Sequence, residues 1–168
     1  MFQIQFGNNK GILIIDVLIA ISVIIIAFVS ILGFASFSLR FSSLQEEMNQ
    51  ANFLCQEIIE AVRNFRDGTS WSTNGIGVLT TNLDYYPQAT GSPATWQLVQ
   101  GRENINGFER KVIFQKVSRD PTTKNIESSY NPVNDDPDTR KIIATVSWQE
   151  RGRTHQVEVI TYLTNWKK

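Results

Sequence analysis

The hydrophobic pattern divides the chain into two unequal parts. Residues 17–39 contain no charged side chain and are rich in Ile, Val, Leu and Phe. At about 1.5 Å per residue, a helix over this stretch is roughly 35 Å long, which is enough to cross a bilayer. The pattern therefore predicts one membrane-spanning helix close to the N-terminus.

After Arg40 the apolar residues narrow to a stripe that recurs in steps of three and four, as on one face of an amphipathic helix. The stripe lasts only about three heptads, so we interpret it as the core-facing side of a helix rather than as a coiled coil. Gly68 supplies a stop, because glycine readily takes the left-handed conformation after a helix end. The two stretches together predict a helix over residues 12–66. The stripe consists of Leu44, Met48, Ala51, Cys55, Ile58, Val62 and Phe65.

Beyond the helix the pattern changes to the alternation expected of strands. Residues 67–95 are rich in Gly, Thr, Ser, Asn and Pro, and predict a long loop with one short strand near Val78. In the last strand pair one face of each strand is apolar, and a turn containing Gly152 joins them as a hairpin. The predicted strands are residues 96–100, 108–117, 141–149 and 154–163; the apolar faces are Ile142, Ala144, Val146 and Trp148 in the first strand of the pair, and His155, Val157, Val159 and Leu163 in the second.

These elements predict an α+β fold. An antiparallel sheet of three or four strands has one apolar face to cover, and the helix stripe can cover it. The expected architecture is a long N-terminal helix, half in the membrane and half amphipathic, packed on a small antiparallel β-sheet.

Composition narrows the possible functions further. A chain of 168 residues has room for one domain and an appendage, and its 16 basic and 16 acidic residues indicate no attraction to nucleic acid. The single cysteine, Cys55, excludes an internal disulfide and a CxxC metal site. The only histidine, His155, falls on the inward side of a strand and is interpreted as structural. Glu57 and Glu60 are interpreted as a solvated helix face, and with no catalytic motif visible we expect no enzyme.

One acidic loop offers a weak candidate for a metal site. Residues 118–140 include Asp135, Asp136 and Asp138, and calcium takes six to eight oxygen ligands in flexible loops. The carboxylates lack a spaced ligand pattern. We therefore expect no cofactor, with calcium as a low-ranked alternative.

The sharpest feature lies at the start of the apolar run. A short polar leader ends in Lys10 and Gly11, and Asp16 then places a carboxylate inside the membrane segment. An acidic residue at the centre of an apolar helix costs about 2.5 to 3.5 kcal/mol on insertion scales, so it usually has a partner or a function. Lys10 and the N-terminal amine favour a cytoplasmic leader, which would place the rest of the chain outside.

Residues 10–21 resemble the class III leader of type IV prepilins, in which a short basic leader ends in Lys-Gly and an acidic residue stands fifth in the mature chain. The resemblance implies that prepilin peptidase cuts between Gly11 and Ile12 and methylates the new N-terminus at Ile12. It also implies that Asp16 pairs with the terminal ammonium of Ile12 on the neighbouring subunit. The family usually has Phe where this chain has Ile12 and Glu where it has Asp16, and Gly33 stands in the membrane helix where major pilins often carry a proline.

The resemblance gives the expected organisation and partners. Residues 56–67 and the closing hairpin look like the minor-pilin and type II secretion minor-pseudopilin branch. The expected parts are a leader (1–11), a membrane and assembly helix (12–39), an amphipathic helix (40–67) and an extracytoplasmic sheet domain with long loops (68–168). The implied partners are prepilin peptidase, other pilin or pseudopilin subunits, an inner-membrane assembly platform and the lipid bilayer.

The resemblance implies a structural role, and several alternatives stay open at this point. The expected location is the bacterial cytoplasmic membrane, spanned once, followed by an extracellular or periplasmic filament. One alternative is a permanently anchored extracytoplasmic binding module, and another is a pseudopilin of DNA uptake, which would need a basic, aromatic-lined surface. Cleavage and release near Gly33 is disfavoured, because the apolar run before it is longer than in ordinary secretory signals.

Overall fold

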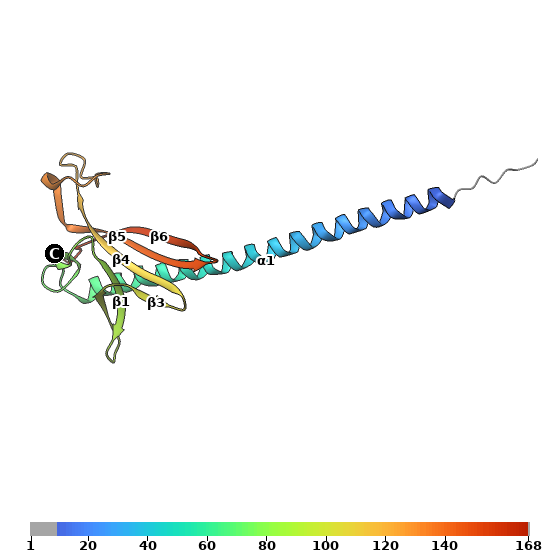
Figure 1. Ribbon diagram of the computed structural model, residues 1–168. Coiled ribbons are helices and arrows are strands. Elements are labelled where there is room, and N and C mark those ends of the chain that lie inside the picture. Colours follow the sequence, from blue (N-terminus) through green and yellow to red (C-terminus); the bar gives the residue numbers. More distant parts are fainter. Residues whose placement is uncertain (1–9, 168) are drawn as a thin grey trace, which may run out of the picture. The chain divides into compact units, whose positions relative to one another are not determined.

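The computed structural model describes residues 10–167, and their side chains from residue 14 onward. The chain forms two compact units, Met1–Glu46 and Glu47–Lys168. One helix, α1, extends from Lys10 to Gly68 and supplies the described part of the first unit and the opening of the second (Figure 1). The predicted helix is confirmed, with two more residues at each end. The predicted leader falls largely on residues 1–9, which lie outside the described residues.

The second unit contains an antiparallel sheet, which confirms the α+β expectation. Its spatial order is β2-β1-β4-β5-β6, with β3 paired to β4 at the side of this path. The prediction of three or four strands was too low, because six strands are described. Their bounds are β1 Asp84–Thr90, β2 Thr95–Gln100, β3 Glu103–Ile105, β4 Phe108–Ser118, β5 Asp135–Glu150 and β6 Arg153–Thr164; two short 3-10 helices are η1 Ile76–Val78 and η2 Pro132–Asn134.

The predicted C-terminal hairpin is confirmed and is longer than expected. β5 and β6 pair without a register shift from Thr139 opposite Thr164 to Glu150 opposite Arg153. The connecting residues Arg151 and Gly152 have φ values of 49° and 77°. Two consecutive positive φ angles are those of a type I′ turn, whose twist matches that of paired strands.

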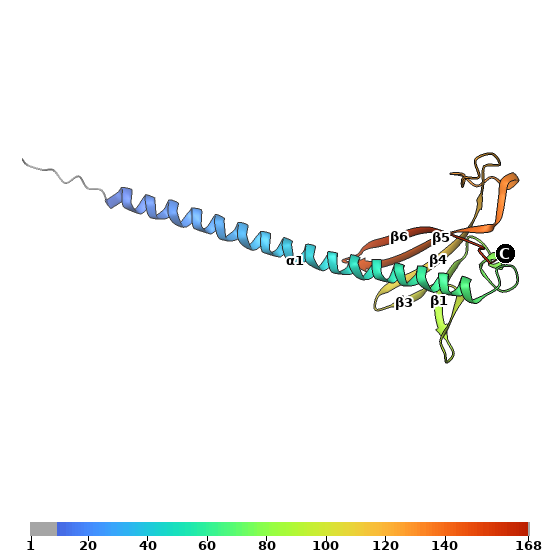
Figure 2. The same cartoon turned by 180° about the vertical axis from the view of Figure 1, so that it is seen from behind.

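The core of this unit lies between α1 and one face of the sheet. The C-terminal part of α1 lies behind the sheet in Figure 1 and in front of it in Figure 2. The central residues of the predicted stripe are buried, as are the inward residues of β4 and β5. These residues are Ala51, Cys55, Ile58 and Val62 on the helix, and Val112, Phe114, Ile142, Ala144 and Val146 on the sheet.

The prediction was wrong at the start of the stripe. Met48 is 38% exposed, and the neighbouring Glu47 is half-buried instead. The reason is Trp148, whose indole Nε1 donates a 2.7 Å hydrogen bond to Glu47 Oε2. A buried indole N–H needs an acceptor, and this requirement brings Glu47 toward the sheet.

Two predicted loops contain regular structure. Residues 67–95 include β1 and η1 rather than one short strand near Val78, and residues 118–140 give way to β5 at Asp135. The strand β1 carries Pro87, which weakens a strand signal. The proline is tolerated because β1 pairs with β4 only at Asp84 and Tyr85, so Pro87 has no strand partner on β4 that would require an N–H group from it.

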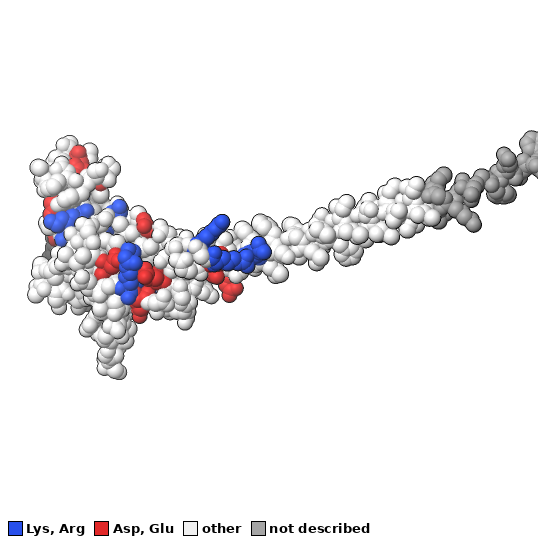
Figure 3. Space-filling model, in the orientation of Figure 1, with Lys and Arg blue, Asp and Glu red and all other residues white. Residues whose placement is uncertain are grey.

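The sheet face turned away from α1 carries ionic contacts. Asp84 accepts hydrogen bonds from Arg102 Nε at 2.6 Å and Lys111 Nζ at 3.1 Å, and Arg102 also contacts Glu109 at 3.0 Å. Figure 3 shows acidic and basic side chains side by side on this face. Burial alone would raise the pKa of Asp84, but the hydrogen bonds from Arg102 and Lys111 outweigh it and lower this pKa below its usual value.

Candidate functional site

The first part of α1 is an apolar helix whose described hydrophobic side chains are exposed in the single chain. Its large hydrophobic side chains from Ile14 to Phe41 are exposed, the least at Ile21 (48%) and the most at Phe34 and Leu39 (73%). The helix is long and apolar enough to cross a membrane. A surface of this kind needs lipid or other apolar helices around it.

Three of the four hydroxyl groups within residues 17–39 donate to the backbone of the helix. Ser22 donates to the carbonyl of Leu18 at 2.7 Å, and Ser30 donates to that of Ile26 at 2.8 Å. Ser36 makes the same contact with Leu32 at 2.9 Å. Because each of these three hydroxyls bonds to the backbone four residues earlier, none of the three requires water, and their part of the helix remains compatible with hydrocarbon surroundings.

The predicted processing and assembly residues lie at the start of α1. Gly11 and Ile12 belong to the helical backbone, whereas the side chain of Ile12 lies outside the described side chains. Asp16 is exposed and is the only charged residue between Gly11 and Arg40. The helix therefore presents one carboxylate on an otherwise uncharged apolar surface, one turn after Ile12.

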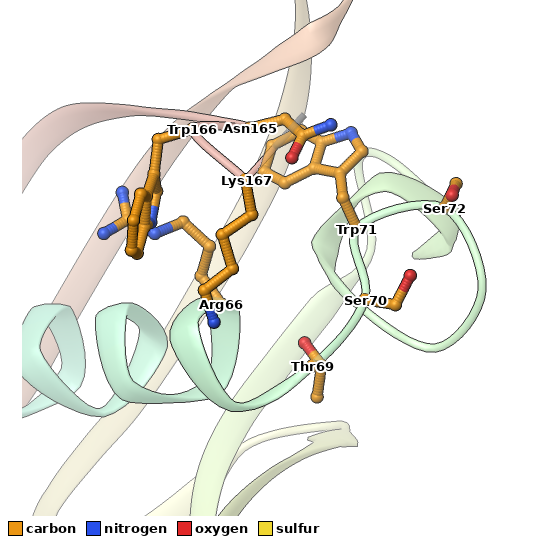
Figure 4. A pocket seen from close by; sticks show the side chains of 8 residues that line it. All are labelled: Arg66, Thr69, Ser70, Trp71, Ser72, Asn165, Trp166 and Lys167. Carbon is orange, nitrogen blue, oxygen red and sulfur yellow. The ribbon is translucent and has the colours of Figure 1, made fainter.

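A small pocket lies at the other end of α1, where the C-terminal tail meets the helix. It has a volume of about 330 Å³ and lies between Trp166 and Arg66 on one side and Trp71 on the other (Figure 4). Arg66 Nε and Trp166 Nε1 donate to the same carboxylate oxygen of Asp67, at 2.8 and 3.0 Å, and Lys167 donates to the Asp67 carbonyl.

These contacts also change the pKa of Asp67. The hydrogen bond from Arg66, reinforced by that from Trp166, lowers the pKa of Asp67. The basic groups of the pocket are thus engaged with Asp67, which joins the tail to the helix end. Trp71 Nε1 donates to the carbonyl of Pro137 at 3.1 Å and anchors the opposite wall.

The candidate calcium residues have separate partners. Asp135 accepts from the Tyr130 hydroxyl at 3.0 Å, Asp136 pairs with Arg119, and Asp138 accepts from Asn165 Nδ2 at 3.1 Å. Burial would raise the pKa of Asp136, but hydrogen bonds from its neighbours outweigh it and lower this pKa. Within residues 10–167, no three His, Cys, Asp or Glu side chains are grouped so that they could hold a metal ion. Calcium binding stays a prediction.

Sequence reasoning missed two polar contacts between α1 and the sheet. Arg110 is 4% exposed and its guanidinium contacts Glu57 on α1 at 3.0 Å and Glu103 on β3 at 2.7 Å. Glu57 is therefore not simply part of a solvated face, whereas Glu60 is exposed as expected and pairs with Arg63 on the helix surface. The second contact is that of Glu47 with Trp148. The only sign of the Arg110 contacts in the sequence was a charged residue at position 110, where the alternation of the strand places an inward-facing side chain.

The sole histidine lies beside the same tryptophan. His155 stacks on Trp148, with ring centroids 5.5 Å apart, and its Nε2 lies 3.6 Å from Glu150. Cys55 is fully buried, and burial raises the pKa of its thiol to about 11. The surroundings of His155 and Cys55 are therefore those of residues that contribute to packing.

No protein-family model matches the chain, and no curated protein or solved structure matches it either.

Proposed function

We propose that this chain is a structural subunit, a minor pilin or a type II secretion minor pseudopilin, that polymerises through its N-terminal helix into a filament. Prepilin peptidase removes the leader after Gly11 and methylates Ile12. The subunit then stays in the cytoplasmic membrane, with its sheet domain outside, until an inner-membrane assembly platform extracts it. The observation that carries the proposal is Asp16, a lone carboxylate on an exposed apolar helix one turn after Ile12.

The exposed apolar surface of α1 supports this role. Lipid covers the helix while the subunit is stored in the membrane, and the helices of neighbouring subunits cover it in the polymer. Removing apolar surface from water is favourable by roughly 25 cal/mol for each Å². The helix therefore cannot leave the bilayer without another apolar partner to cover it. Polymerisation supplies that partner.

The position of Asp16 adds specificity to this apolar association. In the filament its carboxylate pairs with the terminal ammonium of Ile12 on the adjoining subunit. A pair at 4 Å gains about 4 kcal/mol at an effective dielectric of 20, comparable to the cost of about 2.5 to 3.5 kcal/mol for an acidic residue in the membrane. The gain from the ion pair thus roughly offsets the cost of placing the carboxylate in the membrane. A subunit docked out of register bears the cost without the gain, so Asp16 sets the stagger between subunits.

Processing of the N-terminus tests the proposal. Full-length protein is expressed in a host that has prepilin peptidase and in a matched host that lacks it, and the N-terminus is identified by mass spectrometry. We expect a methylated Ile12 in the first host and the intact leader in the second. An intact Met1 in both hosts contradicts the proposal and favours a permanently anchored binding module.

A further inference from the structure

A groove in the second unit lies between the C-terminal end of α1 and the strand at one edge of the sheet. Its volume is about 610 Å³, and its walls include Phe65 on the helix and Trp96 and Leu98 on β2. None of the described residues that line it carries a charge. The groove contrasts in this respect with the ionic face of the sheet and with the pocket beside Asp67.

The strand that forms one wall is open at its outer edge. Among the described strands β2 pairs only with β1, and the two form a hairpin that extends away from the rest of the sheet (Figure 1). An open edge presents main-chain N–H and C=O groups to any extended chain that approaches it. Native edges are usually protected by charges or proline, but residues 95–100 contain neither.

The strand register identifies which groups point outward. Leu98 stands opposite Pro87, which has no N–H, and the Pro87 carbonyl accepts from Arg110 NH2 at 3.4 Å instead. The pair is therefore not hydrogen-bonded, and the N–H and C=O of Leu98 face away from β1. By the alternation of antiparallel pairs the same holds for Trp96, opposite Ala89.

The same two residues turn their side chains toward the groove. Pro87 is fully buried on the sheet face that packs against α1, and side chains directly opposite one another lie on the same face. The main-chain N–H and C=O groups of Trp96 and Leu98 therefore lie at the open edge of β2, and their apolar side chains lie on the sheet face that packs against α1. An added strand would find hydrogen-bond partners on β2 and would direct alternate side chains into the groove.

We infer that this groove binds an extended segment of a partner polypeptide, added as a strand to the edge of β2, with uncharged apolar side chains directed between β2 and α1. The absence of charge on the lining disfavours nucleic acid and acidic or basic peptides, which need counter-charges. The inference does not depend on the filament proposal, because an anchored module and a filament subunit would both present the same groove.

Peptide selection on the full-length protein tests the inference. The protein is placed in lipid nanodiscs and used to select from a phage-displayed library of random peptides about ten residues long, which is sufficient for one strand. We expect the retained peptides to share a run in which alternate residues are apolar and uncharged. Retention no higher than on empty nanodiscs, or enrichment of charged runs, would overturn the inference.

Two further measurements use the synthetic form of the tightest peptide. N-methylation of alternate peptide amides is expected to weaken binding about tenfold or more, because an added strand depends on main-chain hydrogen bonds, whereas methylation of the intervening amides has little effect. Leu98→Glu is expected to weaken binding similarly. Gln88→Glu, which places the same charge on the exposed opposite face of the hairpin, is the matched control and is expected to bind as wild type.

The N-methylation series does not depend on how any variant folds. Binding that is equally tolerant of methylation at every amide contradicts strand addition, even if Leu98→Glu is inactive. Equal loss of binding in Leu98→Glu and Gln88→Glu contradicts the assignment of the groove face.

Discussion

The thiol of Cys55 is expected to be inert in the folded protein. Its Sγ lies 3.7 Å from the carbonyl oxygen of Val157, and burial raises the pKa of the thiol to about 11. Because the thiolate is the reactive form, Ellman's reagent at pH 8 should leave Cys55 unmodified until denaturant is added. Phe53→Cys in a Cys55→Ser background is the control and should react at once, since position 53 is 67% exposed. Rapid labelling of native Cys55 would contradict the packing at this site.

The carboxylate of Asp84 is expected to make stability depend on pH. Hydrogen bonds from Arg102 and Lys111 outweigh burial and lower the pKa of Asp84 in the folded state. A lowered pKa stabilises the fold fully above the ordinary Asp pKa of about 3.9, and this contribution is lost as pH falls through the folded-state value. Asp84→Asn should therefore lower the free energy of unfolding at pH 7 by up to about 1 kcal/mol, and by progressively less as the pH is lowered.

Denaturant unfolding in detergent, followed by circular dichroism at several pH values, measures the effect of Asp84→Asn. The matched control is Glu158→Gln on the exposed face of β6, for which we expect a change within about 0.5 kcal/mol. A difference between wild type and Asp84→Asn that stays constant down to the lowest pH would show that ionisation of Asp84 is not responsible.

At the scale of residues, burial along the centre of the stripe was predictable from sequence, whereas the exposure of Met48 and the polar pairing were not. The period of the stripe gave the burial of Cys55, because helical geometry fixes which side chains share a face. Arg110 and Glu57 are 53 positions apart, and only the folded sheet brings their side chains within 3.0 Å. The assignment of Glu57 to a solvated face was incomplete for this reason.

The second part of α1 is expected to derive its stability from packing on the sheet. Ile58 is fully buried on the sheet side of the helix, whereas Phe53 is 67% exposed. Ile58→Ala should lower the free energy of unfolding by about 2 to 5 kcal/mol, because it leaves a cavity in the core. Phe53→Ala in the same helix should change it by no more than about 0.5 kcal/mol. Comparable losses in the two variants, measured on detergent-solubilised monomer, would contradict the orientation of the helix.

At the scale of elements, long periodic segments were predictable and irregular ones were not. The helix and the β5–β6 hairpin carry sustained periodicity, and both were assigned correctly from sequence. β1 was missed because Pro87 and the polar residues around it give no alternating signal, and its strand form depends on pairing with β2. The groove was missed with it, since its wall exists only when that hairpin is in place.

The whole molecule combines an apolar helix with a sheet domain whose surfaces have different characters. The outer face of the sheet carries ion pairs, the end of α1 is tied to the C-terminal tail through Asp67, and the groove beside β2 is uncharged. In the proposed filament the helix provides assembly and the sheet domain distinguishes this subunit from others. The helix, its length and its lone carboxylate were readable from sequence, because an apolar run long enough to cross a bilayer is visible in composition alone.

The role of Asp16 in assembly is tested most directly by recovery of subunits in filaments. Asp16→Ala and Asp16→Glu are expressed in a host that assembles the filament, and the amount of processed subunit is compared between sheared filaments and membranes. We predict that Asp16→Ala is processed normally but recovered in filaments at least about tenfold less than wild type, as expected for a lost interaction of about 1.4 kcal/mol or more. Asp16→Glu keeps the charge and should be incorporated. Normal incorporation of processed Asp16→Ala would contradict the account.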